Sequence, residues 1–243
     1  MKQTIFTIAE NTALTATVYK MVLAGDTDGI TTGQFVNILL DGLYLRRPIS
    51  VCDCQGDTLT LVYKVVGKGT AQMAAMIAGQ TLDVLTGLGN GYDLSKAGDH
   101  PLLLGGGVGV PPLYMAARQL RAQGKAVSVI LGFNTADEVF YEQEFAALGC
   151  DVTVTTADGS HGVKGFVTDA LPADYSYFYT CGPEPMLKAV YAATVTSGQF
   201  SFEERMGCGF GACMGCSCKV ITGYKRICKD GPVLEKEEIL WDA

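Results

Sequence analysis

Leu104-Gly105-Gly106-Gly107-Val108-Gly109-Val110-Pro111-Pro112 is the most informative segment for the architecture of the central part of this 243-residue chain. A short apolar strand over 101–104 leads into it, and a helical pattern over 113–123 follows it. Glycines at such a turn let the backbone approach phosphates, and the helix start stabilises their negative charge. The G-x-G-x-x-G fingerprint is incomplete, because Pro112 stands in place of the third glycine. The stretch therefore favours a nucleotide site without identifying the nucleotide.

The segment around this turn, residues 97–200, alternates strands with helices. Strands are expected at 101–104, 126–131, 151–155 and 175–180, and helices at 113–123 and 138–148. This order predicts a parallel sheet with crossover helices. Cys181-Gly182-Pro183-Glu184-Pro185-Met186 follows the last strand, as the glycine stretch follows the first. By itself this second turn is equally well explained as the start of a helix, with Cys181 as a small core residue.

Residues 1–96 read instead as several short strands separated by Gly and Asp turns, which predicts a small antiparallel barrel. One short helix is expected near residues 71–77, and Gly67-Lys68-Gly69-Thr70 leads into it. Arg46-Arg47-Pro48-Ile49-Ser50 follows a strand, and an Arg and a Ser three residues apart can grip a pyrophosphate. The R-x-x-S pattern alone is weak, and an exposed turn explains it more often.

Residues 201–243 form a third segment, rich in Cys and Gly, with an acidic tail expected to be helical. Cys208-Gly-Phe-Gly-Ala-Cys213-Met-Gly-Cys216, with Cys228 downstream, has the C-x4-C-x2-C…C spacing of plant-type [2Fe–2S] ligands. The glycines at 207, 209, 211 and 215 are expected to permit the positive φ angles of a loop that curls around a cluster. A four-cysteine zinc site or incidental buried thiols are the alternatives, but zinc ribbons usually pair two C-x2-C knuckles. Cys218 is treated as a non-ligand, since the other cysteines satisfy the spacing.

The composition restricts the partners and the compartment. The net charge of −7 and the pI near 4.8 argue against nucleic acid and anionic lipid. No stretch approaches the roughly 20 apolar residues of a membrane span, and the first residues lack a signal-peptide pattern. We therefore expect a cytoplasmic protein, whose nine cysteines serve some purpose other than disulfides. His100 and His161 are expected to be ordinary surface or turn residues.

Taken in this order, the motifs resemble those of the ferredoxin-reductase superfamily, which joins an FAD-binding barrel to a nucleotide domain. The resemblance implies that Arg47 and Ser50, with Pro48 and Ile49 between them, bind FAD phosphate, and that Val62, Tyr63 and Lys64 line the flavin. It implies that Gly69 and Thr70 complete this site, and that Gly107, Gly109 and Pro112 match the nucleotide motif G-x-G-x-x-P. It also places Cys181 near the nicotinamide.

The appended cysteines narrow the resemblance to the electron-transfer subunits of dihydroorotate dehydrogenase B, over essentially the whole chain. Cys208, Cys213, Cys216 and Cys228 fall on that family's four cluster ligands. The resemblance implies electron flow from dihydroorotate at the FMN of a separate catalytic subunit, through the cluster and FAD, to NAD⁺. It implies a heterotetramer with two copies of each chain, in pyrimidine biosynthesis.

Two other interpretations remain open from the sequence. One is the small subunit of an NADH-dependent ferredoxin–NADP oxidoreductase or a sulfide dehydrogenase, and the other is a non-enzymatic ferredoxin-like carrier. The nucleotide is expected to be NAD(H), because no Arg or Lys occurs between Ala126 and Cys150 to meet a 2′-phosphate. Asn134 stands where an NADP-binding Arg would serve, and the acidic residues nearby are Asp137, Glu138, Glu142 and Glu144.

Overall fold

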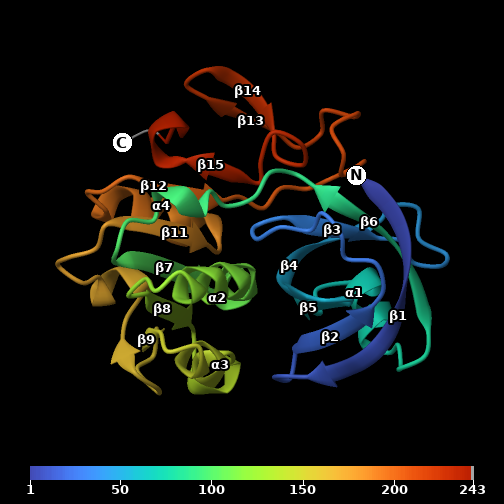
Figure 1. The fold of residues 1–243 in the computed structure, drawn as a ribbon, viewed down its shortest axis with the longest axis horizontal. Helices are drawn as coiled ribbons and strands as arrows, with labels where there is room; N and C mark the ends of the chain where they lie inside the picture. The colour runs from blue at the N-terminus through green and yellow to red at the C-terminus, as the bar shows by residue number, and fades with distance from the viewer. Residues whose placement is uncertain (242–243) are drawn as a thin grey trace.

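The computed structural model describes residues 1–241, and its first unit is a closed six-stranded antiparallel barrel (Figure 1). The barrel strands, in the order β1-β2-β5-β4-β3-β6 around the barrel, are β1 (Lys2–Ala13), β2 (Val18–Ala24), β5 (Thr58–Lys64), β4 (Arg47–Gln55), β3 (Phe35–Ile38) and β6 (Thr81–Leu88). Alternate residues of β6 are buried, which is the pattern of a strand with one face on a core. Helix α1 (Lys68–Ala74) buries Met73 in the barrel core and begins three residues earlier than expected, directly after Gly67.

The second unit is a sheet that is parallel except at one edge, with the order β10-β9-β8-β7-β11-β12-β15. Its parallel strands are β7 (Pro101–Gly106), β8 (Ser128–Phe133), β9 (Asp151–Thr156), β10 (Val163–Lys164), β11 (Tyr177–Cys181) and β12 (Gly198–Ser201). The connecting helices are α2 (Tyr114–Ala122), α3 (Glu142–Ala147) and α4 (Glu184–Ala193). The antiparallel barrel and the parallel sheet confirm the fold class expected from the sequence.

The prediction of a helix at 138–148 is wrong for residues 138–141. Only α3 is helical there, preceded by a single 3₁₀ turn at Ala136–Glu138. The chain between these two elements buries Phe140 and Tyr141, and Phe140 packs edge-on against Phe133 of β8 with ring centroids 5.2 Å apart. Burying two consecutive aromatic side chains takes precedence over the local preference for helix.

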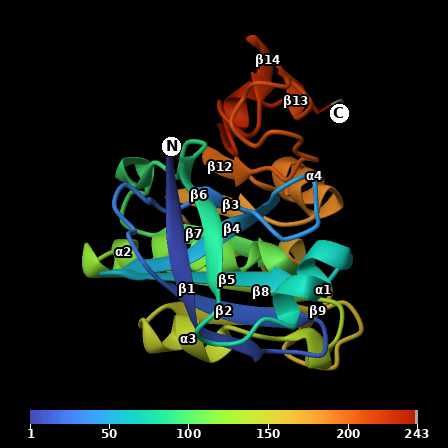
Figure 2. The same ribbon diagram turned by 90° about the vertical axis from the view of Figure 1, so that its right-hand side faces the viewer.

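The third unit follows β12 and caps one end of the other two, as both views show (Figures 1 and 2). It contains a hairpin of β13 (Ser217–Val220) and β14 (Gly223–Arg226), and the strand β15 (Val233–Glu235). The prediction of a helical tail is wrong. Strand β15 pairs antiparallel with β12, and among the described residues it is followed only by one 3₁₀ turn, at Lys236–Glu238. Val233 and Leu234 are buried by this pairing. The sheet of the second unit is therefore completed by a strand from the third.

The remaining short elements are 3₁₀ turns at Leu94–Lys96, Gly107–Gly109, Pro111–Leu113 and Val167–Ala170. No helix within residues 1–241 has the length and apolar character needed to cross a membrane.

Two hydrophobic cores join the units, in addition to the core inside the barrel. Leu103 of β7 faces one of them, together with Cys52 and Val62 of the barrel. The neighbouring Leu102 faces the other, with Phe35 of the barrel and Cys216 and Cys228 of the third unit. Because adjacent residues of a strand point to opposite faces, one face of the sheet packs against the barrel, and the other packs against the third unit together with Phe35 of the barrel.

Polar contacts reinforce these junctions. Arg118 of α2 donates from Nε and Nη2 to the same carboxylate oxygen of Asp53 in β4, at 3.0 and 2.7 Å. Asp53 is 7% exposed, so its charge depends on this guanidinium for compensation.

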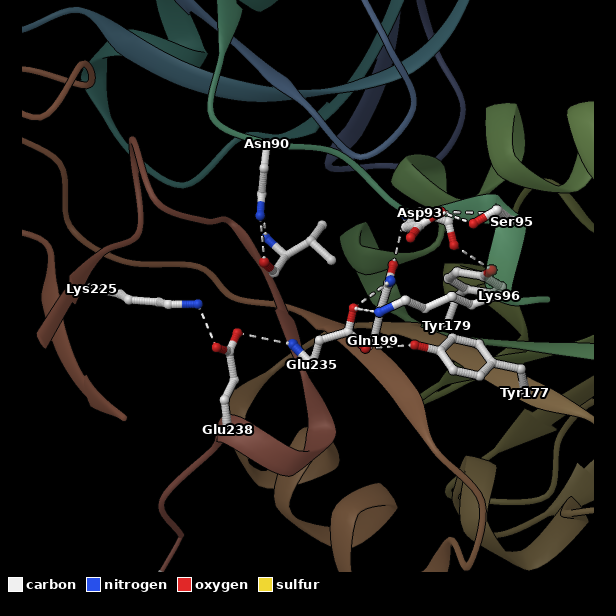
Figure 3. Close-up of polar contacts among 11 residues, drawn as sticks. Asn90, Asp93, Ser95, Lys96, Tyr177, Tyr179, Gln199, Lys225, Glu235 and Glu238 are labelled. Carbon is white, nitrogen blue, oxygen red and sulfur yellow. Dashed lines mark hydrogen bonds and ion pairs between the residues drawn. The ribbon is translucent and has the colours of Figure 1, made fainter. Parts of the chain in front are cut away.

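Figure 3 shows a second polar network, in which Glu235 of β15 joins the third unit to the segment between the barrel and the sheet. Its carboxylate accepts from Lys96 Nζ and Tyr177 Oη, both at 2.7 Å, and from Gln199 Nε2 at 2.9 Å. The Asn90 side chain adds a two-way pairing with the Val233 backbone, donating at 2.7 Å and accepting at 3.0 Å. The three units are thereby held in one arrangement.

Candidate functional site

A cleft of about 750 Å³ lies between the barrel and the carboxyl ends of the parallel strands. Open α/β sheets bind ligands at this end of their strands. The barrel side contributes residues of β4 and β5: Pro48, Ile49, Ser50, Val62, Tyr63 and Lys64. The sheet side contributes Gly107, Gly109 and Cys181. Motifs that are up to about 130 residues apart in the sequence therefore meet in one cavity.

Arg47, Gly69 and Thr70 lie just outside this lining but against one another. A Cβ atom added to Gly69 would stand 2.2 Å from Arg47 Nε, so the guanidinium lies directly across the first turn of α1. The Thr70 hydroxyl accepts from the backbone N–H of Val66 at 2.9 Å and of Gly67 at 3.2 Å, which shapes that turn. Arg47 Nη1 donates to the backbone carbonyl of Leu45, which leaves Nε and Nη2 of the guanidinium beside the first turn of α1 at one edge of the cleft.

The glycine-rich turn owes its form to close packing. Gly107 has φ +52°, and a Cβ at Gly109 would lie 2.3 Å from the carbonyl oxygen of Cys181. Only glycine at position 109 lets the two turns approach each other so closely. Pro112, in contrast, is buried in the 3₁₀ turn before α2 and does not line the cleft.

Cys181 ends β11 and faces the cleft. Burial raises the pKa of its thiol to about 12, and the nearby Glu203 carboxylate adds to this while a hydrogen bond with Ser201 opposes it. Cys181 is therefore a neutral thiol at physiological pH.

Asn134 and Glu138 lie where the cleft reaches the carboxyl end of β8. Asn134 donates to Glu138 Oε2 from its side-chain Nδ2 at 2.8 Å and from its backbone N at 3.2 Å. The two form a polar unit with one carboxylate facing the cleft.

The cleft is also lined by four residues that no sequence motif indicates: Phe202, Glu203, Glu204 and Met206. They follow β12 and carry no motif of their own. They reach the cleft because β12 lies beside β11, which is a long-range arrangement.

The cysteine loop at 208–216 packs against the barrel and turns through Gly209 (φ +77°) and Gly211 (φ +90°). The expectation of positive φ angles is wrong for Gly207 and Gly215, and Met214 instead has φ +61°. All nine cysteines lie within residues 1–241, and none of them forms a disulfide.

Backbone N–H groups of this loop point at cysteine sulfurs. Cys208 Sγ accepts from the N–H groups of Ala212 at 3.2 Å and of Cys213 at 3.4 Å, and Cys213 Sγ accepts from Cys208 at 3.4 Å. In the same way Cys216 Sγ accepts from Cys228 at 3.4 Å. Burial raises the pKa of Cys208, but hydrogen bonds from the backbone N–H groups of Phe210, Cys213 and Ala212 outweigh this and hold that pKa below its ordinary value.

The donor set fits an iron–sulfur cluster, whose negative sulfurs are stabilised by N–H groups of this kind. Within residues 1–241 no three His, Cys, Asp or Glu side chains stand close enough together to form a metal site as they are. Backbone N–H to sulfur hydrogen bonds join Cys208 with Cys213, and Cys216 with Cys228. Cys218 lies outside these contacts, in β13, where burial raises the pKa of its thiol.

A flavin-type barrel and a nucleotide-type sheet meet at one cleft, and a cysteine loop packs against the barrel nearby. This arrangement defines a protein of the ferredoxin-reductase class with an added iron–sulfur unit. Residues 103–192 match the oxidoreductase NAD-binding domain, and residues 203–240 match the iron–sulfur cluster binding domain of dihydroorotate dehydrogenase B.

Curated relatives agree along the whole length. The "Dihydroorotate dehydrogenase B (NAD(+)), electron transfer subunit" of Geobacillus sp. (strain WCH70) is 42% identical, over 99% of this chain and 99% of its own. The protein of the same name from Fusobacterium nucleatum is 46% identical, over 93% and 94%. The chain belongs to this family of electron-transfer subunits.

Solved structures resemble the fold as well. A chain from the structure of an NADH-dependent reduced ferredoxin–NADP oxidoreductase superposes with a TM-score of 0.89 at 30% identity, covering 97% of this chain and 90% of that one. A ferredoxin–NADP⁺ reductase from Neisseria gonorrhoeae gives a TM-score of 0.69 at 19% identity, over 79% of this chain and 90% of that one. The second likeness extends only to the fold.

Proposed function

We propose that the cleft holds FAD on its barrel side and the nicotinamide of NAD(H) on its sheet side, and that the 208–216 loop with Cys228 holds a [2Fe–2S] cluster. The chain is an electron-transfer subunit of an NAD-linked oxidoreductase by its family. One observation carries the residue assignment: the barrel motif and the two nucleotide turns line a single cavity of about 750 Å³.

In this proposal Arg47, Ser50 and the Gly69–Thr70 turn hold the FAD pyrophosphate. The guanidinium offers a fork of donors, and the first turn of α1 adds backbone N–H groups. Val62, Tyr63 and Lys64 line the part of the cleft assigned to the ring system, although the Tyr63 side chain itself lies in the barrel core. The Tyr63 hydroxyl donates to Asn11 Oδ1 at 3.0 Å, which keeps the ring of Tyr63 in place, and burial raises its pKa to about 12.

Gly107 and Gly109 leave room for the nucleotide phosphates, and Cys181 lies beside the nicotinamide. Because Cys181 stays protonated, it places no negative charge next to the carbon that exchanges hydride. Glu138, held by Asn134, accepts from the adenosine ribose hydroxyls and repels a 2′-phosphate. These residues account for a preference for NAD(H).

A bound flavin supplies the chemistry that joins the two sites, because it exchanges electron pairs with a nicotinamide and single electrons with a cluster. The residues of this chain position the partners and exclude water. The cysteine loop also exposes apolar side chains, with Phe210 44% and Met214 54% exposed. Exposed apolar groups beside a redox site suit contact with another protein.

We propose that this partner is the FMN-containing, dihydroorotate-oxidising catalytic subunit, in a cytoplasmic complex of two copies of each chain. Mixing the purified chain with such a subunit should give dihydroorotate-dependent NAD⁺ reduction that neither shows alone. Phe210→Ser should lower the rate of dihydroorotate-dependent NAD⁺ reduction. Ile77→Ser should not lower it, because Ile77 is an exposed apolar residue on the barrel, after α1. Sedimentation of the complex tests the stoichiometry.

A second candidate is supported by the TM-score of 0.89 to the NADH-dependent ferredoxin–NADP oxidoreductase chain. In that case the partner would be a larger flavoprotein that acts on ferredoxin and NADP(H). Activity restored only with such a partner, and not with a dihydroorotate-oxidising subunit, would favour this candidate.

A further inference from the structure

Strand β3 (Phe35–Ile38) stands between the cleft and the cysteine loop. Val36 and Ile38 point into the barrel core, so Phe35 and Asn37 point outward from it. Phe35 lines the cleft and belongs to the hydrophobic core that contains Cys216 and Cys228. One face of β3 therefore borders both proposed redox sites.

Asn37 makes the polar contact from this face to the loop. Its side chain is buried, at 2% exposure for the residue, and Nδ2 donates to the carbonyl oxygen of Cys208 at 3.3 Å. A Cβ at Gly209 would stand 2.3 Å from the same Nδ2, so the loop backbone lies directly on the Asn37 amide. Arg46 fixes the strand at this point, because Nη1 donates to the Asn37 carbonyl at 3.2 Å and to Asp83 Oδ1 at 2.8 Å.

The other half of the Asn37 amide is unsatisfied. Oδ1 is buried and has no hydrogen-bond partner among the described residues. A buried oxygen without a donor destabilises the fold, whereas an apolar side chain of the same size would not. Oδ1 therefore gives asparagine no advantage over leucine at position 37, and the Nδ2 contact with Cys208 is what asparagine adds.

We infer that Asn37 is a positioning residue, which anchors the Cys208 end of the cluster loop to the flavin barrel and so fixes the separation of the two redox sites. This inference rests on the proposed function, since it takes the cleft as the flavin site and Cys208 as a cluster ligand. Asn37 itself need not touch either cofactor.

Asn37→Leu in the full-length chain, purified with its cofactors, tests the inference. The variant should melt close to the wild-type temperature, because removal of the unpartnered oxygen offsets loss of the hydrogen bond to the Cys208 carbonyl. Hydrogen exchange at the amides of residues 208–213 should become about fivefold faster, as expected when one hydrogen bond no longer holds the loop closed. The EPR signal of the reduced cluster should broaden, and NADH should reduce the cluster more slowly while reducing the flavin at the wild-type rate.

Thr32→Val is the matched control. Thr32 Oγ1 is also buried and unpartnered, and the residue precedes β3. This change removes a comparable oxygen and should leave loop exchange, EPR signal and cluster reduction unaltered.

Wild-type exchange, EPR signal and cluster reduction in Asn37→Leu would overturn the inference. Asn37→Ser, whose hydroxyl is too short to reach Cys208, is the second variant in case leucine misfolds. If both variants lose FAD, cluster and stability together, the role of Asn37 is structural and the inference is equally wrong. A wild-type protein that binds no FAD or cluster would instead refute the proposed function.

Discussion

Arg47 offers the sharpest test of the proposed flavin site, because its neighbour Arg46 provides a natural control. The Arg47 guanidinium lies across the first turn of α1 at the edge of the cleft. Arg46, one residue earlier, points to Asp83 and forms an ion pair of 2.8 Å there. Arg47→Ala therefore tests phosphate binding, and Arg46→Ala tests the stability of the barrel.

The expected loss follows from the kind of contact. A hydrogen bond to a charged group contributes about 1.5–3 kcal/mol, so Arg47→Ala should weaken FAD binding at least roughly tenfold. Arg46→Ala should lower the melting temperature, because Asp83 loses its partner, but FAD affinity should stay within about threefold.

Gly69→Ala sharpens the same prediction without removing the arginine. The new Cβ would lie 2.2 Å from Arg47 Nε, the flexible end of a side chain, so the guanidinium must move while the backbone can stay. Alanine is better than glycine inside a helix by about 0.5–1 kcal/mol. We expect a protein that is at least as stable as the wild type but binds FAD more weakly.

Fluorescence titration of flavin-free protein with FAD, together with thermal unfolding, measures both quantities. Wild-type affinity in Arg47→Ala and in Gly69→Ala would refute the assignment of this turn to the pyrophosphate. Equal losses in Arg46→Ala and Arg47→Ala would show that the effect is one of stability.

The remaining predictions concern the cluster, the nucleotide and the junction between units. Serine at Cys208, Cys213, Cys216 or Cys228 should abolish or shift the EPR signal of the reduced cluster, while Cys218→Ser should leave it intact; loss of the signal in Cys218→Ser alone would contradict the ligand set. The wild type should show a higher kcat/KM for NADH than for NADPH, and Glu138→Gln should narrow that ratio because the carboxylate that repels a 2′-phosphate is gone; an unchanged ratio would exclude Glu138 from this role. Arg118→Met should lower the free energy of unfolding by about 2 kcal/mol in urea titrations, since Asp53 keeps a buried charge without its guanidinium; the double variant Arg118→Met/Asp53→Asn should recover part of this loss.

Local motifs made much of the fold and of the proposed site predictable. The glycine turn at 104–112 and the Cys181-Gly182 turn each follow a strand directly, so strand order alone brings them to the same edge of the sheet. Packing explains why their residue types are so restricted. Gly106 and Gly182 each leave room for the sulfur of Met186, which would lie 2.4 and 2.7 Å from an added Cβ.

The missed features depend on contacts between distant parts of the chain. A helix is locally favoured by the charged run at 235–238. Glu235 nevertheless pairs with Gln199 in β12, so the tail begins as a strand. Phe202 and Met206 reach the cleft because they follow β12, which lies beside β11 in the sheet. Met214 adopts a positive φ that no pattern in the sequence indicates, because the loop itself requires it.

The pairing of β12 with β15 also bears on how the protein is made. The cysteine loop and its hairpin lie in the chain between these two neighbouring strands, so they form an insertion within one sheet. A ribosome delivers β12 first and β15 about thirty residues later, and domains generally fold in that order as they emerge. The barrel and the inner strands can therefore fold, and accept their ligands, while the edge of the sheet is still open. Closing that edge with β15 ties both ends of the cysteine segment to one sheet, so the segment reaches its final anchorage only when the last strand of the sheet is in place.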